Sequence, residues 1–234
     1  MPALDRFLTG AIASIAVGVL AGLVARGRAD ACWSFPAYLL TAIGGHTLLA
    51  ARPATFWTWD FLLATDLLQV ILRAAIAFEI AARTFGPLPA GRRKVRWIFG
   101  IGALLIGLAV AVYPGARTTT FDLTLIVAPA SYGVSLLFAA FLGLTAYYYV
   151  PVDPVHRDIA LGFVLLSVLA AFTQPLSGLD PIVGWGRDFL VKLSYPLLLA
   201  WWARRAWAKE EPTALSREAM QILQPWRVKR VWWD

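Results

Sequence analysis

The polar residues of the apolar segment 56–82 are the strongest candidates for chemistry in this chain. Asp66, Gln69 and Arg73 recur at positions i, i+3 and i+7, a spacing that places them on one face of a helix. An ionisable side chain inside a bilayer costs roughly 3 kcal/mol or more, so it needs a partner or a wet cavity. Arg73 lies near the middle of the segment, too deep for its side chain to reach the interface easily. We therefore expect this stripe to be buried among other helices.

A second group of charges lies in the apolar segment 182–203, where Asp188 precedes Lys192 by one helical turn. In the topology derived below, this segment and 56–82 both run from outside to inside, so Lys192 and Asp66 could stand at the same depth. We expect Lys192 to pair with one of these two carboxylates. The predicted buried polar network comprises Asp60, Asp66, Gln69, Arg73, Asp188 and Lys192. It either fixes how the two helices pack, or forms a proton or ion path or a polar ligand site.

Established catalytic and metal-binding motifs are missing from the sequence. It has no G-x-S-x-G, H-E-x-x-H, C-x-x-C or P-loop pattern. Its single cysteine, Cys32, excludes an intrachain disulfide, and its two histidines, His46 and His156, fall on opposite sides of the predicted topology. We expect His46 to be a hydrogen-bonded helix residue. The sequence therefore predicts no enzymatic activity, no metal and no cofactor.

The elements that must position these residues are predicted membrane-spanning helices. The chain has 234 residues, of which 59% are hydrophobic and only 15% charged, whereas soluble domains carry about 25% charged residues. A spanning helix needs about 20 mostly apolar residues. Seven stretches qualify: 7–25, 32–50, 56–82, 95–113, 122–150, 159–175 and 182–203. The predicted fold is an all-α, seven-transmembrane-helix bundle over residues 1–207, followed by a tail over 208–234.

The distribution of lysine and arginine predicts the orientation of this bundle. With the N-terminus outside, eleven basic residues fall on cytoplasmic segments as far as Lys209, against four on outer segments. This is the positive-inside pattern, and it places the C-terminus in the cytoplasm. The net charge of +7 is thus explained by helix ends and anionic lipid, so we expect no nucleic-acid partner. The predicted location is the bacterial inner membrane.

Three further patterns predict local packing. Small residues recur every fourth position in the first segment, at Gly10, Ser14, Gly18 and Gly22. Such a stripe lets another helix approach closely, either within the bundle or at a homodimer seam. Glu79 and Arg83, four residues apart at the inner end of 56–82, are expected to form a local ion pair. Pro129 predicts a kink in the segment 122–150.

The tail combines a short amphipathic stretch over 213–224 with a basic and aromatic end. Alternating aromatic and basic residues suit the surface of an anionic leaflet, and docking on a partner protein is the competing interpretation. The predicted contact residues are Trp226, Arg227, Lys229, Arg230, Trp232 and Trp233.

Asp188 and Lys192 also match one pattern of the microbial rhodopsins. That seven-helix family carries retinal on a lysine of the last helix, with an aspartate four residues before it, and Asp60 stands where a third-helix counter-ion could lie. The sequence departs from the family elsewhere: Trp57 replaces the arginine of the third-helix pattern, and 159–175 lacks the Trp and Tyr-Pro that enclose retinal. A retinal-binding function is therefore the least favoured alternative.

A broader resemblance covers roughly residues 56–205. Phe78-Glu79-Ile80 is followed by Arg83, Phe85, Pro87 and Pro89 before a basic loop, and the segment 159–163 reads Ile-Ala-Leu-Gly-Phe. Together with the region of Tyr195 and Trp201, this layout resembles an uncharacterised family of bacterial seven-helix membrane proteins. The resemblance implies topology and no chemistry.

These observations favour a non-enzymatic membrane module. The absent motifs and the tail together suggest a sensory or accessory subunit that contacts another membrane protein, or a second copy of itself, through its cytoplasmic face and tail. The main alternative is a small transporter or a proton- or ion-conducting protein that uses the polar stripe of 56–82 with Lys192. Sequence alone does not name a ligand or a partner.

Overall fold

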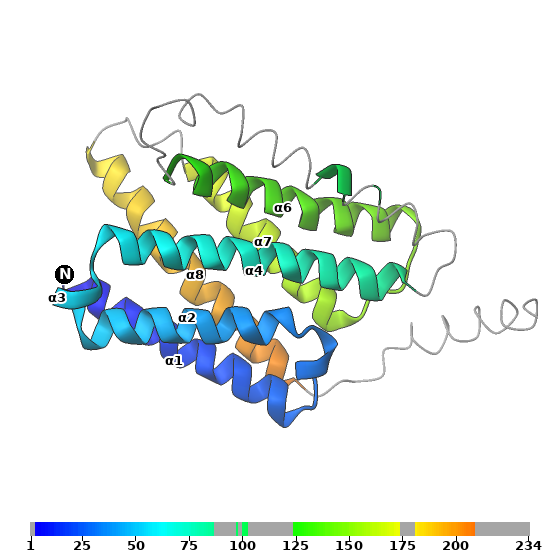
Figure 1. Ribbon diagram of the computed structural model, residues 1–234, viewed down its shortest axis with the longest axis horizontal. Coiled ribbons are helices and arrows are strands. Elements are labelled where there is room, and N and C mark those ends of the chain that lie inside the picture. Colours follow the sequence, from blue (N-terminus) through cyan, green and yellow to red (C-terminus); the bar gives the residue numbers. More distant parts are fainter. Residues whose placement is uncertain (1–2, 87–96, 98–99, 103–123, 174–180, 209–234) are drawn as a thin grey trace, which may run out of the picture.

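The computed structural model describes residues 3–86, 97, 100–102, 124–173 and 181–208, and every regular element among them is a helix (Figure 1). The all-α prediction is confirmed over this part of the chain. The long helices are α1 (Ala3–Ala25), α2 (Ser34–Ala51), α4 (Trp59–Phe85), α6 (Thr124–Tyr147), α7 (Pro154–Thr173) and α8 (Pro181–Trp207). Two short elements join them: η1 (Ala29–Ala31) and α3 (Pro53–Phe56).

The six long helices form a closed ring. In order around the ring, α1 packs against α2, α2 against α4, α4 against α6, α6 against α7, α7 against α8, and α8 returns to α1 (Figure 1). Each helix therefore has two main neighbours. Side chains that point into the ring can pack into a core or surround a cavity. Large aromatic and aliphatic side chains, Tyr38, Phe138, Phe163 and Leu199 among them, are buried there.

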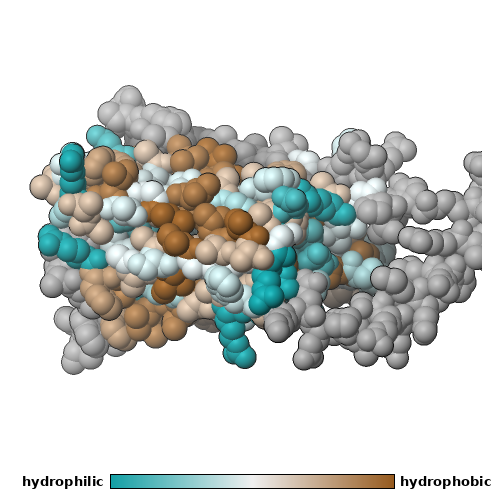
Figure 2. All heavy atoms as spheres, turned by 90° about the horizontal axis from the view of Figure 1, so that it is seen from below, coloured by the Kyte–Doolittle hydropathy of each residue, from teal (hydrophilic) through white to brown (hydrophobic). Residues whose placement is uncertain are grey.

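The outer surface of the ring is apolar along the middle of the helices. Val17, Leu40, Leu136, Leu165 and Leu197 are all exposed. Figure 2 shows hydrophobic side chains gathered in the middle of one face, with hydrophilic ones toward both ends. Three described helical stretches, Asp5–Ala25, Trp59–Phe85 and Ala130–Tyr147, are long and apolar enough to cross a membrane. The structure thus suggests a membrane protein. The predicted segment 95–113 lies mostly outside the described residues, as does the tail after Ala208.

Two arginines after α1 donate hydrogen bonds to the last carbonyl groups of α8. Arg26 donates to the carbonyl of Trp207 over 3.1 Å, and Arg28 donates to the carbonyls of Arg205 and Ala208 over 3.2 and 3.1 Å. The last carbonyls of a helix lack partners within the helix, and its dipole favours cations there. The loop after α1 therefore caps the C-terminus of α8.

The small-residue stripe of α1 packs closely against α8 at one end only. A Cβ atom on Gly22 would lie 2.9 Å from the Trp207 ring, and the Trp207 indole donates to the carbonyl of Gly18 over 3.0 Å. A Cβ atom added to Gly10 or Gly18 would meet nothing within 4 Å, and Ser14 is exposed. Packing inside the bundle thus accounts for the contacts of Gly18 and Gly22. In α6, the helix continues without interruption through Pro129.

Candidate functional site

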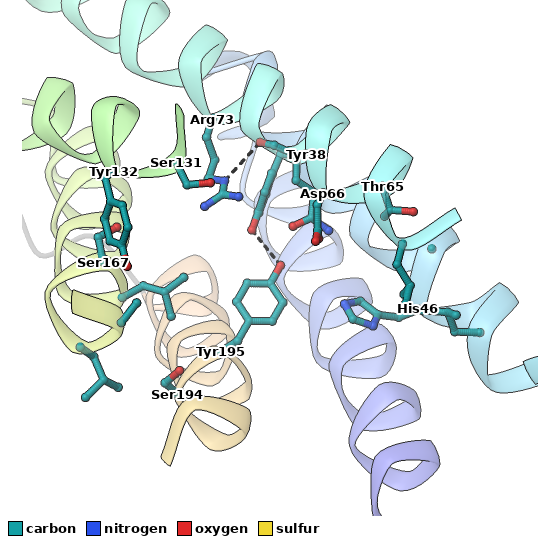
Figure 3. Close-up of a pocket in the computed structure, with 17 residues that line it drawn as sticks. Tyr38, His46, Thr65, Asp66, Arg73, Ser131, Tyr132, Ser167, Ser194 and Tyr195 are labelled. Carbon is teal, nitrogen blue, oxygen red and sulfur yellow. Dashed lines mark hydrogen bonds between the residues drawn. The ribbon is translucent and has the colours of Figure 1, made fainter. Parts of the chain in front are cut away.

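A cavity of about 470 Å³, lined by polar and apolar side chains, lies between the helices of the ring (Figure 3). Five helices contribute to it: α2, α4, α6, α7 and α8. It occupies the half of the ring in which α4 and α6 begin, and it reaches the middle of α8. The polar residues of its lining are Tyr38, His46, Thr65, Asp66, Gln69, Arg73, Ser131, Tyr132, Ser167, Ser194 and Tyr195. Polar groups between apolar helices need partners or a wet cavity, so these side chains make the cavity the candidate site.

The wall formed by α4 is the predicted stripe of Asp66, Gln69 and Arg73. Arg73 Nε donates to the carbonyl of Gln69 over 3.2 Å, so its side chain turns back along the helix by one turn. No ion pair within 4 Å joins Arg73 to Asp66 in the described structure, and the Asp66 carboxylate makes no hydrogen bond there. Both charges line the cavity without a direct ion pair. Gln69 and Arg73 are half-buried, but Asp66 is exposed, so the expectation that the whole stripe is buried is wrong for Asp66.

The floor of the cavity is a pair of tyrosines joined across the ring. The hydroxyls of Tyr38 on α2 and Tyr195 on α8 lie 2.9 Å apart, and the Tyr38 side chain is fully buried. Pro196 follows Tyr195 inside α8, so the helix loses a backbone donor at this level. Residues 157 positions apart in the sequence thus meet at the centre of the structure.

Below this pair, a layer of aromatic rings fills the ring of helices. Tyr38 meets Phe163 edge to face at 5.3 Å between ring centroids, and Phe163 meets Phe138 and Trp202 at 4.9 and 5.1 Å. Phe35 completes the layer against Trp202 at 5.0 Å. Edge-to-face and stacked rings at these separations pack densely. The layer therefore closes the cavity on the side of the α8 C-terminus.

The opposite part of the cavity brings His46 to the level of Asp66. A Cβ atom on Gly45 would lie 3.0 Å from the Thr65 methyl group, so α2 and α4 approach closely at this point. His46 makes no hydrogen bond among the described residues, and its Nδ1 is buried without a partner. The expectation of a hydrogen-bonded His46 is therefore wrong. Its ring lies 6.3 Å from the ring of Tyr195.

The wall formed by α6 and α7 presents hydroxyl groups. Ser167 on α7 donates to the carbonyl of Phe163, and its oxygen forms a short hydrogen bond with Ser135 of α6. Ser135 in turn donates to the carbonyl of Ser131 over 2.8 Å. These hydroxyls join α6 to α7 and place polar oxygens opposite the charged wall of α4.

Lys192 lies outside the central cavity and pairs with α1. Its Nζ forms a salt bridge of 2.8 Å with Asp5 of α1, and its side chain is 49% exposed. The lysine is not among the residues that line the cavity. Its observed partner is Asp5, whereas the expected partner was Asp188 or Asp66. The side chain of Asp188 lies outside the described residues, and Asp60 is exposed in the first turn of α4. Of the expected network, Asp66, Gln69 and Arg73 line the central cavity and Lys192 does not, while the pairing of Lys192 with Asp188 stays a prediction.

A second polar cluster closes the other end of the ring. Asp158 of α7 is buried and forms a salt bridge of 3.0 Å with Arg205 of α8, with Arg157 at 3.9 Å. The Trp202 indole donates to the carbonyl of Asp158 over 3.1 Å. These residues border a second cavity of about 520 Å³ between α1, α7 and α8. Nothing in the sequence pattern singled out Asp158.

Glu79 organises the turn before α2. Its carboxylate accepts hydrogen bonds from the backbone N–H groups of Trp33 and Ser34, over 2.9 and 2.8 Å, and from the Ser34 hydroxyl over 2.6 Å. The predicted ion pair with Arg83 is confirmed, at 2.7 Å. The buried thiol of Cys32 lies 3.5 Å from the same carboxylate. Burial, assisted by the charge of Glu79, raises the pKa of Cys32 to about 12.

Comparisons with known proteins add no assignment to this geometry. No protein-family model matches the sequence, and no curated protein or solved structure is significantly similar to it. Within the described part of the chain, no group of three histidine, cysteine, aspartate or glutamate side chains is arranged to hold a metal ion. Among the described residues, the central cavity is where Asp66, Gln69 and Arg73 meet polar groups of four other helices.

Proposed function

We propose that this chain is a seven-helix protein of the bacterial inner membrane that binds a small polar molecule from the outer side, in the cavity between α2, α4, α6, α7 and α8. It acts as a non-enzymatic sensory or accessory module, and its cytoplasmic face and tail contact a partner in the membrane. The N-terminus is outside and the C-terminus is in the cytoplasm.

The charges at the two ends of the ring support this orientation. The described arginines at the end where α8 finishes are Arg26, Arg28, Arg83, Arg157, Arg204 and Arg205, whereas Arg6 and Arg52 lie toward the opposite end. Cytoplasmic ends of membrane helices carry the excess of lysine and arginine. With this orientation, the cavity lies in the outer half of the bundle and the aromatic layer in the inner half.

The closed floor is the observation that carries the proposal. A conducting path needs polar groups through the whole thickness of the membrane. Among the described residues, the lining of this cavity reaches Tyr38 and Tyr195, and the next layer is formed by Phe138, Phe163 and Trp202. A cavity bordered by an aromatic layer on this side is suited to binding.

The same helix joins the cavity floor to the inner face. Tyr195 and Arg205 both belong to α8, and their Cα atoms lie about 15 Å apart along the helix axis. Between them, Trp202 packs against Phe163 and donates to the carbonyl of Asp158, which holds Arg205. A ligand that shifts α8 at the floor would therefore disturb the contacts from which the tail emerges. This arrangement supports a sensory role.

Cysteine accessibility tests the proposal directly. Cys32→Ser removes the only cysteine of the chain, and Gln69→Cys then places a thiol in the cavity. Ala160→Cys, fully buried beside the aromatic layer, is the matched control. In right-side-out vesicles, a membrane-impermeant methanethiosulfonate reagent should modify the thiol at position 69 and spare the thiol at position 160. Modification at position 69 only from the inner side, or from neither side, would overturn the proposal.

A transporter is the second candidate, and Pro196 is the observation that favours it. A proline inside a spanning helix, next to the tyrosine pair that closes the cavity, marks a point where α8 could bend and open the floor. Proteoliposomes distinguish the two functions: a transporter accumulates labelled ligand in the lumen, whereas a sensory module binds it without net flux.

A further inference from the structure

We propose that the ligand of the central cavity is a small zwitterion of the α-amino-acid class, with its carboxylate on Arg73 and its ammonium group on Asp66. This assignment rests on the function proposed above, because it requires that the cavity is open to a polar molecule from the outer side. It names the class of molecule that the charges of the cavity would select.

Among the described residues, neither charge of α4 forms a direct ion pair within 4 Å, although Asp66 and Arg73 are close enough to attract each other. Arg73 makes one hydrogen bond in the described structure, through Nε to the carbonyl of Gln69, and its two terminal nitrogens are left to the cavity. Asp66 makes none. A guanidinium group recognises a carboxylate through two parallel hydrogen bonds, and a carboxylate accepts from an ammonium group in the same charge-assisted way.

The separation of these charges fits a molecule that carries both. Seven residues of helix place the Cα atoms of Asp66 and Arg73 about 10 Å apart, and the return of Arg73 toward Gln69 shortens the axial gap by about 5 Å, one helical turn. The gap exceeds the reach of a direct ion pair, since none is formed within 4 Å. Because two hydrogen bonds of about 3 Å each and the ligand together are longer than this axial gap, an α-amino acid would lie beside the helix, in the cavity, with its carboxylate toward Arg73 and its ammonium group toward Asp66.

The other residues that line the cavity also suit an α-amino acid. The hydroxyls of Tyr38 and Tyr195 can hydrogen-bond a carboxylate, and Leu49, Leu62 and Leu166 offer apolar surface for a side chain. The volume of about 470 Å³ is within the usual range for small-molecule sites. Asp66 would repel a simple anion and Arg73 a simple cation, so the pair discriminates against ligands with one charge.

The experiment uses the full chain in lipid nanodiscs. Each of the twenty standard α-amino acids is first tested for a shift in the thermal unfolding of the protein, and the strongest is used in radiolabelled form for equilibrium binding. Two derivatives then compete with the radiolabelled amino acid for the site. The amide lacks the carboxylate, and the N-acetyl derivative lacks the ammonium group. We expect each derivative to bind at least about tenfold more weakly than the parent.

Two variants assign the contacts. Arg73→Met should weaken binding at least about tenfold and abolish the preference for the acid over its amide, and Asp66→Asn should abolish the preference for the free amine over its N-acetyl derivative. The matched controls, Asp60→Asn in the exposed first turn of the same helix and the exposed Arg52→Met, should bind like the wild type.

The possible failures separate the two proposals. If no amino acid binds, or if the derivatives compete as well as the parent, the zwitterion assignment is overturned, while modification of the thiol at position 69 would keep the outward-facing cavity. If that thiol is unreactive from outside, the proposed function itself fails. If a variant does not fold, the competition of the amide and the N-acetyl derivative for the wild-type protein still tests the zwitterion assignment.

Discussion

Replacement of Glu79 by alanine should loosen the turn before α2. The carboxylate accepts from two backbone N–H groups at the start of α2 and from the Ser34 hydroxyl, all within 3 Å, and it forms an ion pair of 2.7 Å with Arg83. The first N–H groups of a helix have no partner within the helix, and an anion there is favoured by the helix dipole. One side chain of α4 thus holds the N-terminus of the neighbouring helix.

The size of the effect follows from these contacts. A hydrogen bond to a charged group contributes about 1.5–3 kcal/mol, but the contacts of one carboxylate are not additive. Arg83 is partly exposed and keeps its hydrogen bond to the carbonyl of Asp30. Solvent therefore reduces the free-energy cost of removing its ion-pair partner. We expect Glu79→Ala to lower the free energy of unfolding by about 3 kcal/mol, and Glu79→Gln by about 1 kcal/mol, since its amide oxygen still accepts.

The single native cysteine supplies the assay. A thiol with a pKa of about 12 is almost wholly protonated at pH 8, and only the thiolate reacts, so alkylation of Cys32 should be roughly a thousandfold slower than that of an exposed cysteine. The rate should rise with each pH unit up to pH 10 instead of levelling near pH 9. Removal of the Glu79 carboxylate takes away a negative charge that raises this pKa, so alkylation should become faster in Glu79→Ala.

Two results would refute this reasoning. Thermal unfolding in detergent measures stability, with the exposed Asp60→Ala as the control for loss of a carboxylate from α4. Equal stability of Glu79→Ala and the control would show that the hydrogen bonds to α2 contribute little. Rapid alkylation of wild-type Cys32 at pH 8 would show that the thiol is neither buried nor held against the carboxylate.

The remaining predictions concern packing and the tail. Lys192→Met should cost about 1 kcal/mol in thermal unfolding, and a double-mutant cycle with Asp5→Asn should return a coupling energy of similar size; zero coupling would refute the ion pair. Gly22→Ala should destabilise the protein by about 1–3 kcal/mol because its Cβ meets an indole ring, whereas Gly10→Ala, in open space, should not. A peptide covering 226–233 should bind anionic vesicles and lose that binding when its basic residues are replaced by alanine; if the unmodified peptide ignores such vesicles, docking on a partner is the better interpretation.

Periodic and local features of this protein could be predicted from the sequence. Helical spacing alone placed Asp66, Gln69 and Arg73 on one face, and they line one cavity. The pair of Glu79 and Arg83 followed from a spacing of four residues. Both predictions depend on the geometry of a single helix, which is the same wherever that helix lies in the fold.

Contacts between helices could not be predicted in the same way. Asp5 was overlooked as a partner of Lys192 because it lies at the start of the first apolar segment, and the ring topology alone brings α1 beside α8. Tyr38 and Tyr195 carry no charge and resemble ordinary core aromatics in the sequence, although their hydroxyls form the floor of the cavity. In each case the missing information was which helices are neighbours, and at what depth they touch.

The pairing of the charges distinguishes the cavity from the rest of the bundle. Glu79, Asp158 and Lys192 lie away from the central cavity, and each has an oppositely charged partner within about 3 Å. Asp66, which is exposed, and Arg73, which is half-buried, line the cavity, and neither has an oppositely charged partner within 4 Å among the described residues. A charge network whose only role was to fix helix packing would have its members joined, as the other three are. Two opposite charges that line one cavity without a direct ion pair are instead what a site for a molecule with both charges requires.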